Sequence, residues 1–341
     1  MNDTSLGLSA LAAISPVMVY VLAIWWMDRY EREPLWLLGV TFGYGAIVGI
    51  LGAVLGSTLI VQVFGVDDFT TQAVVVAPFI EEPAKAFILM LLLLTFHFDN
   101  ATDGLVYGAA TGLGFAMTEN FLYFAQYEGG SEEWIDLVAA RSLFTAILHA
   151  CASAMVGAML GLFRYRGTLK QWLLAPAIGL SGAIALHAAY NASVLKGELG
   201  GEPSYTVLAY TMVALMGVLL FGAIQVSLFF EHKMLGRELA DEADQGHIPA
   251  QHAAILPFYS RRRGADWLAD YPELAASRQS RRTYVRKATL LAFRKHQAKS
   301  PGPIPSGIGA DIRRLRKDIR GMLGREEPAV RQSAEELGTG A

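Results

Sequence analysis

The 341-residue chain has a single cysteine, Cys151, so it can form neither an internal disulfide nor a cysteine-ligated metal cluster. Charged residues are scarce at 17%, whereas 53% of the residues are hydrophobic. Lysine and arginine are scarcest in residues 1–231, where 8 of them are outnumbered by 18 acidic residues; residues 232–341 hold 20 basic and 13 acidic residues. This composition is not that of a soluble globule and predicts two domains: a membrane domain over 1–231 and a basic tail over 232–341.

Long apolar runs divide the first domain into seven predicted membrane spans, each long enough for the ~20-residue helix that crosses a bilayer. The predicted fold class is therefore all-α, a polytopic bundle of about seven transmembrane helices. The second run exceeds one straight crossing and is rich in glycine, which leaves a tilt or a break open. The runs are Leu6–Met27, Leu35–Phe64, Thr71–Phe96, Gly104–Gln126, Leu137–Phe163, Trp172–Leu195 and Tyr205–Phe230.

The distribution of lysine and arginine among the loops predicts the orientation, because these residues gather on the cytoplasmic side. Basic residues occur in the loops after the first and fifth spans and in the tail, and the alternate loops hold only Lys196. We therefore expect the N-terminus outside and the tail in the cytoplasm.

Three charges lie in the middle of the third apolar run: Glu81, Glu82 and Lys85. A charge at the bilayer centre costs roughly 2.5–3.5 kcal/mol even on insertion scales, so such residues face a protein interior and are candidates for a functional site. One helical turn brings Lys85 to either carboxylate. A purely structural ion pair is the simpler interpretation, but it needs only one carboxylate.

Other polar residues inside the spans reach a similar depth in the outer half of the bilayer. From the rise of an α-helix, Glu119 and Asn120 lie about 10 Å below the outer boundary, His149 about 18 Å and His187 about 12 Å. Asn191 follows one turn after His187, on the same face, and the paired glutamates lie near 15 Å. Polar residues with separate structural roles have no reason to agree in depth, so we expect four spans to form one site.

The tail contains a basic segment at 278–297 that could lie on an anionic membrane surface. A linker rich in Pro and Gly follows at 299–309, and then an amphipathic helix over Asp311–Leu323 with Asp311 as its N-cap. From Arg325 onward we expect disorder. A solvated helical tail is the simpler interpretation, and charge alone does not predict a nucleic-acid partner.

The polar set fits hydrolysis of a peptide bond without a serine or cysteine nucleophile. Carboxylates can activate water, imidazoles can move protons, and an amide can bind an oxyanion. The HExxH pattern of metallopeptidases is absent, although Glu119, His149 and His187 could ligate a metal. No aspartate lies in the middle of a span, which argues against an aspartyl intramembrane protease.

These motifs, taken together and in order, resemble those of the PrsW family of bacterial intramembrane proteases. That family is similar in turn to the CAAX prenyl proteases and bacteriocin-processing enzymes. The likeness covers about residues 71–195 and departs in the long basic tail. The matching motifs are EExxK at Glu81, Glu82 and Lys85, FxxxEN at Phe115, Glu119 and Asn120, HxxxS at His149 and Ser153, and HxxxN at His187 and Asn191.

The resemblance implies a metal-independent glutamic peptidase in the bacterial plasma membrane, with no cofactor. It makes Glu81 the base, with Glu82 as its partner, and assigns the oxyanion to His187 and Asn191. Glu119 takes the place of a CAAX-protease histidine, and His149 is a further site residue without an assigned role. The implied substrate is a membrane-anchored protein, such as an anti-sigma factor, cut near the outer face. A catalytically silent scaffold or a proton-coupled transporter is the alternative, although no inverted repeat supports a transporter.

Overall fold

The computed structural model describes residues 3–95, 97–164, 168–300 and 307–324, and every regular element in them is a helix. The predicted all-α fold is therefore confirmed. By its internal contacts the chain divides into two compact units, Met1–Leu228 and Phe229–Ser300 together with the segment that contains helix α14.

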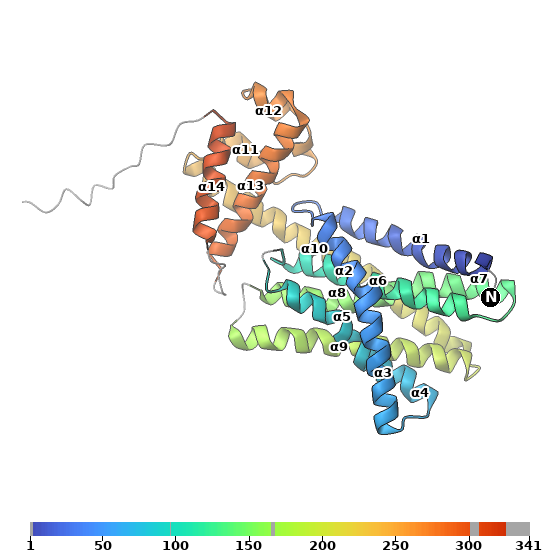
Figure 1. Ribbon diagram of the computed structural model, residues 1–341. Coiled ribbons are helices and arrows are strands. Elements are labelled where there is room, and N and C mark those ends of the chain that lie inside the picture. The colour runs from blue at the N-terminus through green and yellow to red at the C-terminus, as the bar shows by residue number, and fades with distance from the viewer. Residues whose placement is uncertain (1–2, 96, 165–167, 301–306, 325–341) are drawn as a thin grey trace, which may run out of the picture. The chain divides into compact units, whose positions relative to one another are not determined.

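The first unit is a bundle of long helices (Figure 1). Three of these helices include a π-helical segment, in which the backbone hydrogen bonds span five residues. In chain order the elements are α1 (Asp3–Met27), α2 (Leu35–Gly43), η1 (Tyr44–Gly49), α3 (Ile50–Phe64), α4 (Phe69–Thr71), η2 (Gln72–Val76), α5 (Ala77–Leu92), α6 (Ala101–Gln126), α7 (Ser131–Ala140), η3 (Arg141–Thr145), α8 (Ala146–Phe163), α9 (Leu169–Glu198) and α10 (Pro203–Asp244).

Five helices of the described chain are long and apolar enough to cross a membrane: Leu6–Met27, Leu35–Phe64, Ser131–Phe163, Lys170–Glu198 and Pro203–Asp244. The third and fourth predicted spans also form helices, over 69–92 and in α6. The first of these is set apart by its three charges, Glu81, Glu82 and Lys85, and the second is less hydrophobic because it is rich in glycine, threonine and polar residues. The count of seven spans stays a prediction, and Phe96 lies outside the described residues.

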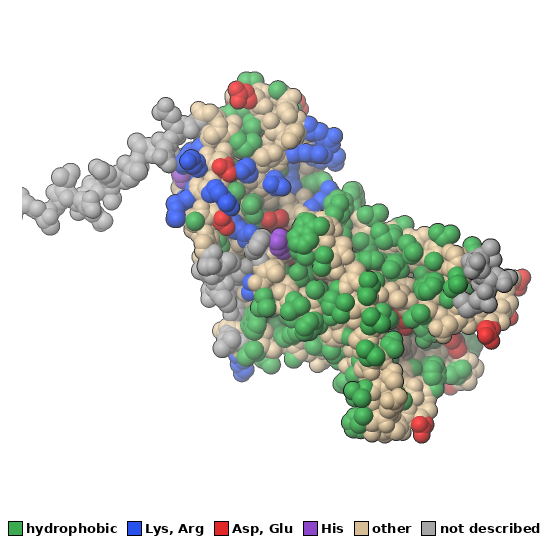
Figure 2. Space-filling model, viewed as in Figure 1, with side chains coloured by type: hydrophobic (Ala, Val, Ile, Leu, Met, Phe, Trp, Pro, Cys, Tyr) green, Lys and Arg blue, Asp and Glu red, His purple; other side chains and the backbone are tan. Residues whose placement is uncertain are grey.

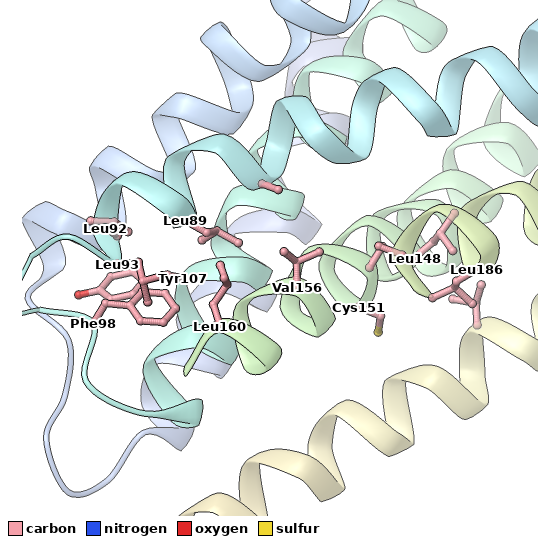
Figure 3. Packing of buried hydrophobic residues seen from close by; sticks show 14 of the residues in the cluster. Leu89, Leu92, Leu93, Phe98, Tyr107, Leu148, Cys151, Val156, Leu160 and Leu186 are labelled. Atoms are coloured by element: carbon pink, nitrogen blue, oxygen red, sulfur yellow. The ribbon is translucent and has the colours of Figure 1, made fainter. Parts of the chain in front are cut away.

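Helix α6 is the centre of the bundle and packs against α1, α2 and α8. Small residues let α6 and α8 approach closely: a Cβ on Gly112 would lie 2.1 Å from the carbonyl oxygen of His149, and one on Gly104 would lie 2.0 Å from that of Gly157. Figure 3 shows Leu148, Val156 and Leu160 along α8, packed with residues of α5 and α9 in one apolar core. The close approach of α6 and α8 fixes the position of His149 along α6.

Apolar side chains cover much of the face of the first unit that is seen in Figure 2. Among them Leu55 and Phe64 on α3 are 69% and 72% exposed, and Leu94 is 74% exposed. Soluble proteins rarely expose apolar surface on this scale. Such a surface is what a bilayer covers, so it agrees with a membrane domain.

The second unit is a folded helical assembly and not merely a solvated tail. It comprises the last part of α10 with α11 (Ala250–Ile255), η4 (Arg261–Arg263), η5 (Asp266–Leu268), α12 (Pro272–Ala276), α13 (Arg278–Ala298) and α14 (Ile308–Met322). Its polar core contains Lys295, which lies 2.5 Å from Glu242 and 2.6 Å from Asp241.

Helix α14 begins one turn earlier than predicted, because Ile308 extends its apolar stripe. Gly307 is its N-cap, so the predicted N-cap at Asp311 is wrong; Asp311 lies in the first turn and pairs with Arg314 at 2.9 Å. The predicted disorder from Arg325 onward, and most of the predicted linker, lie outside the described residues.

Candidate active site

A buried ion pair on α5 anchors the polar residues of the bundle. Lys85 Nζ lies 2.6 Å from Glu82 Oε1, and neither side chain is exposed. The two residues are one turn apart, as expected for positions i and i+3 of a helix. The ammonium also lies 4.6 Å from the centre of the Phe115 ring on α6, a cation–π contact.

The same carboxylate oxygen of Glu82 holds His187 on α9. His187 Nδ1 lies 2.7 Å from Glu82 Oε1, and because a carboxylate only accepts, Nδ1 carries the hydrogen. The other ring nitrogen, Nε2, has no hydrogen-bond partner in the described chain. Glu82 therefore orients an imidazole whose second nitrogen is free to bind or move a proton.

Lys85 fixes the tautomer of His149 on α8 in the opposite sense. Its ammonium lies 2.8 Å from His149 Nδ1, and because an ammonium only donates, Nδ1 is the acceptor. Nε2 then carries the hydrogen and donates to Glu119 Oε2 at 2.8 Å. The rings of His149 and His187 meet edge to face, with centroids 5.0 Å apart. One chain of contacts thus joins α9, α5, α8 and α6.

Arg141, at the start of η3, completes this chain. Its Nη2 lies 3.1 Å from Glu119 Oε1, its Nε donates to Asn120 Oδ1 at 2.9 Å, and its guanidinium lies 3.6 Å from the centre of the Tyr123 ring. Arg141 is not among the site residues predicted from the sequence, although a charge inside the predicted span Leu137–Phe163 is a visible signal. With Arg141 included, the site holds two permanent cations, Lys85 and Arg141, and three carboxylates, those of Glu81, Glu82 and Glu119.

Glu81 and Glu82 are adjacent in sequence but have different surroundings. Glu81 lines a cavity of ≈ 630 Å³ between α3, η2, α5 and α6, and Glu82 does not. The Oε2 atom of Glu81 has no hydrogen-bond partner in the described chain. It lies 4.0 Å from Lys85 Nζ and 3.9 Å from His187 Nδ1. Glu119 and Tyr123 line the same cavity. Glu81 is therefore the carboxylate with an open side, where water and a substrate can reach it.

Asn191 lies apart from these contacts. Its Nδ2 donates to the backbone carbonyl of Ala73 in η2 at 2.8 Å. The structure thus joins the predicted site residues Glu82, Lys85, Glu119, Asn120, His149 and His187 in one network, with Glu81 beside it and Asn191 at its edge. The catalytic roles of these residues stay predictions.

Comparison with known proteins covers the part of the chain that forms this site. The family model described as "PrsW family intramembrane metalloprotease" matches residues 33–220, more than half of the chain and all four motif-bearing helices. The chain belongs to the PrsW family. No solved structure matches it.

Three relatives, each named Protease PrsW, show the extent of the likeness. The protein of Oceanobacillus iheyensis is 29% identical over 209 residues, which cover 61% of this chain and 90% of the relative. The protein of Bacillus subtilis is 28% identical over 183 residues, covering 53% and 79%, and that of Clostridioides difficile is 29% identical over 164 residues, covering 47% and 68%. The chain is thus an intramembrane peptidase of a bacterial family, and its substrate is a protein in a membrane.

The family description names a metal, and three residues of this chain could hold one. One ligand atom each of Glu81, His149 and His187 lies within 4.8 Å of the others. Two histidines and a carboxylate are the donor set of many catalytic zinc sites. Glu81 and His187 have unpaired donor atoms, but both nitrogens of His149 are already engaged, by Lys85 and Glu119. For His149 to bind a metal, one of those two hydrogen bonds would have to break. The three residues are thus of the right type to hold a metal, but the hydrogen bonds of His149 in this structure do not leave a nitrogen free for it.

Proposed function

We propose that this chain is a glutamic peptidase in which Glu81 activates water to cleave a membrane-anchored protein. The observation that carries the proposal is the contrast between the two glutamates: Glu81 lines the cavity and its side chain is 14% exposed, whereas Glu82 is fully buried, does not line the cavity and is bonded to Lys85 and His187 through Oε1. A general base must reach both water and the scissile carbonyl. Of the two, Glu81 meets that condition.

In the proposed reaction Glu81 takes a proton from water as the water oxygen bonds to the peptide carbonyl carbon. The carbonyl electrons move to oxygen, and the resulting oxyanion is stabilised by His187 through Nε2, in its protonated form. The intermediate then collapses. The C–N bond breaks, the proton on Glu81 passes to the leaving nitrogen, and the products are a new carboxyl group and a new amine.

The remaining residues hold these groups in place. Glu82 accepts the Nδ1 hydrogen of His187 and so orients the imidazole, which leaves Nε2 available to the substrate. Glu119 pairs with the charge of Arg141, and the neutral ring of His149 accepts a hydrogen bond from Lys85 and donates one to Glu119. A divalent metal held by Glu81, His149 and His187 would instead polarise the carbonyl and acidify water.

The expected substrate is a protein with one membrane span, cut near the outer face of the plasma membrane. The support is the depth of the site together with the positive-inside orientation. Both partners are then held in the same bilayer, and the chain needs no nucleic acid.

The test is cleavage of single-span substrates by purified protein in liposomes, with and without chelator. Wild type is compared with Glu81→Gln, Glu82→Gln and His187→Ala at equal folded amounts. We expect Glu81→Gln to abolish cleavage and chelator to have no effect. Inhibition by chelator, reversed by added metal, would replace the glutamic mechanism by a metal site, and wild-type rates from Glu81→Gln would refute the role of Glu81.

A further inference from the structure

The π-helical segment η2 determines which side chain of α5 enters the cavity. Phe69, Ala73, Ala77 and Glu81 all line the cavity at intervals of four residues. In an uninterrupted α-helix, twelve residues would place Glu81 about 120° around from Phe69, at about 100° per residue. The wider π turn absorbs about one extra residue and removes most of this drift.

An uninterrupted helix would present a different residue. Ile80 is eleven residues after Phe69, which leaves it only about 20° from the same direction in a regular α-helix. In the structure Ile80 points instead toward α3, where its Cγ2 would lie 2.7 Å from a Cβ on Gly56. The π turn therefore exchanges an apolar side chain for a carboxylate in the lining of the cavity.

The π turn leaves the carbonyl of Ala73 without a backbone donor. The amide of Ala77, which would bond to it in an α-helix, bonds to Gln72 instead. The next residue, Pro78, has no N–H and cannot make the alternative five-residue bond. The side-chain amide of Asn191, on α9, donates to this carbonyl at 2.8 Å. Its hydrogen bond thus satisfies the acceptor that the π turn creates.

We propose that Asn191 is a positioning residue that stabilises η2 and so aims Glu81, and not Ile80, into the cavity. The proposal deepens the proposed function, because aiming Glu81 affects catalysis only if Glu81 is the base. It also assigns the asparagine of the HxxxN motif to the enzyme backbone instead of the oxyanion. In the resting enzyme, Asn191 Nδ2 therefore uses one of its hydrogens to bond to the carbonyl of Ala73.

The first experiment measures the orientation of α5 without using activity. In a Cys151→Ala background, Ile80→Cys and Glu81→Cys are labelled with a small water-soluble maleimide in liposomes, with Asn191 or with Asn191→Ala. With Asn191 present, we expect the thiol of Glu81→Cys to react much faster than that of Ile80→Cys. Asn191→Ala should shrink or reverse this ratio, whereas Ser193→Ala, two residues along the same helix, should leave it unchanged.

The second experiment measures cleavage by Asn191→Ala in the chain that keeps Glu81. We expect kcat to fall by about 100-fold, as for a misplaced catalytic group, with KM unchanged. A fall in kcat with an unchanged labelling ratio would overturn the proposal in favour of direct oxyanion binding. An unchanged ratio with unchanged kcat would also overturn it. A last combination is a labelling ratio that changes in Asn191→Ala while Glu81→Gln keeps full activity. That pair of results would uphold the positioning by Asn191 and would refute instead the assignment of Glu81 as base.

Discussion

Lys85 Nζ and Glu82 Oε1 lie 2.6 Å apart in the interior of the bundle, and the same ammonium lies 2.8 Å from His149 Nδ1. One cation thus neutralises a buried carboxylate and also sets the tautomer of a histidine on another helix. Because Glu82 is paired with this cation and does not line the cavity, the proposed function assigns the reaction to its neighbour Glu81.

The first prediction concerns this buried pair. Lys85→Met should destabilise the folded protein by about 3–5 kcal/mol, because it leaves Glu82 buried without its cation. Lys85→Met combined with Glu82→Gln should recover most of that loss, since no charge of the pair remains. Thermal unfolding in detergent measures both variants. Equal melting temperatures for the single and double variants would contradict the pairing.

Arg141 gives the second prediction, on activity. Arg141→Lys keeps the charge but cannot reach Glu119 and Asn120 with two nitrogens in one plane, so it is not a conservative change. We expect a loss of roughly tenfold in kcat, the low end of the effect of misplacing a catalytic group, with little change in melting temperature. The measurement is the rate of substrate cleavage in liposomes, with Arg282→Lys, at an exposed arginine of α13, as the control. Equal rates for the two variants would show that the geometry of Arg141 is unimportant.

The motif residues could be brought together from the sequence because helical rise converts position into depth. Glu81, Glu119, His149 and His187 were predicted at similar depths, and the structure joins them or places them within 4 Å of one network. Direction around the helix axis was not predictable in the same way. It depends on π turns such as η2, which hydropathy does not reveal and which rest on contacts such as that of Asn191 with Ala73.

The second unit shows the same limit. Its basic composition was evident, but the pairing of Lys295 with Glu242 joins residues 53 positions apart, and periodicity gives no information on such contacts. The acidic residues of the unit were counted only as charge. In the structure Glu238 and Glu242 are buried against cations.

The third prediction tests this polar core. Lys295→Ala leaves Glu242, which is completely buried, with Arg316 alone, so we expect the unit to lose about 3–5 kcal/mol of stability. Hydrogen–deuterium exchange along α13 in the full chain should then rise strongly. Lys317→Ala, an exposed cation on α14, serves as the control, and equal exchange in both variants would show that the buried pair contributes nothing.

The last prediction concerns pH and the loop between α1 and α2. Asp28 is 2% exposed, and burial raises its pKa from 3.8 to about 7. Because the folded pKa lies above the unfolded one, the folded state favours the protonated form. The contribution of Asp28 to stability is therefore greatest below pH 4 and is lost as the pH rises to about 7.

Asp28→Asn removes this titration and keeps an oxygen to accept the Glu33 backbone amide, which lies 3.2 Å from Asp28 Oδ2. The unfolding free energy of the wild type should fall between pH 5 and 7 by at most about 1.4 kcal/mol per pH unit on account of Asp28. The variant should lack that part of the slope, whereas Asp67→Asn, at an exposed carboxylate, should keep it. Melting temperatures across this range, measured in one detergent, decide the matter: parallel curves for wild type and Asp28→Asn would mean that Asp28 titrates no differently in the folded and unfolded chains.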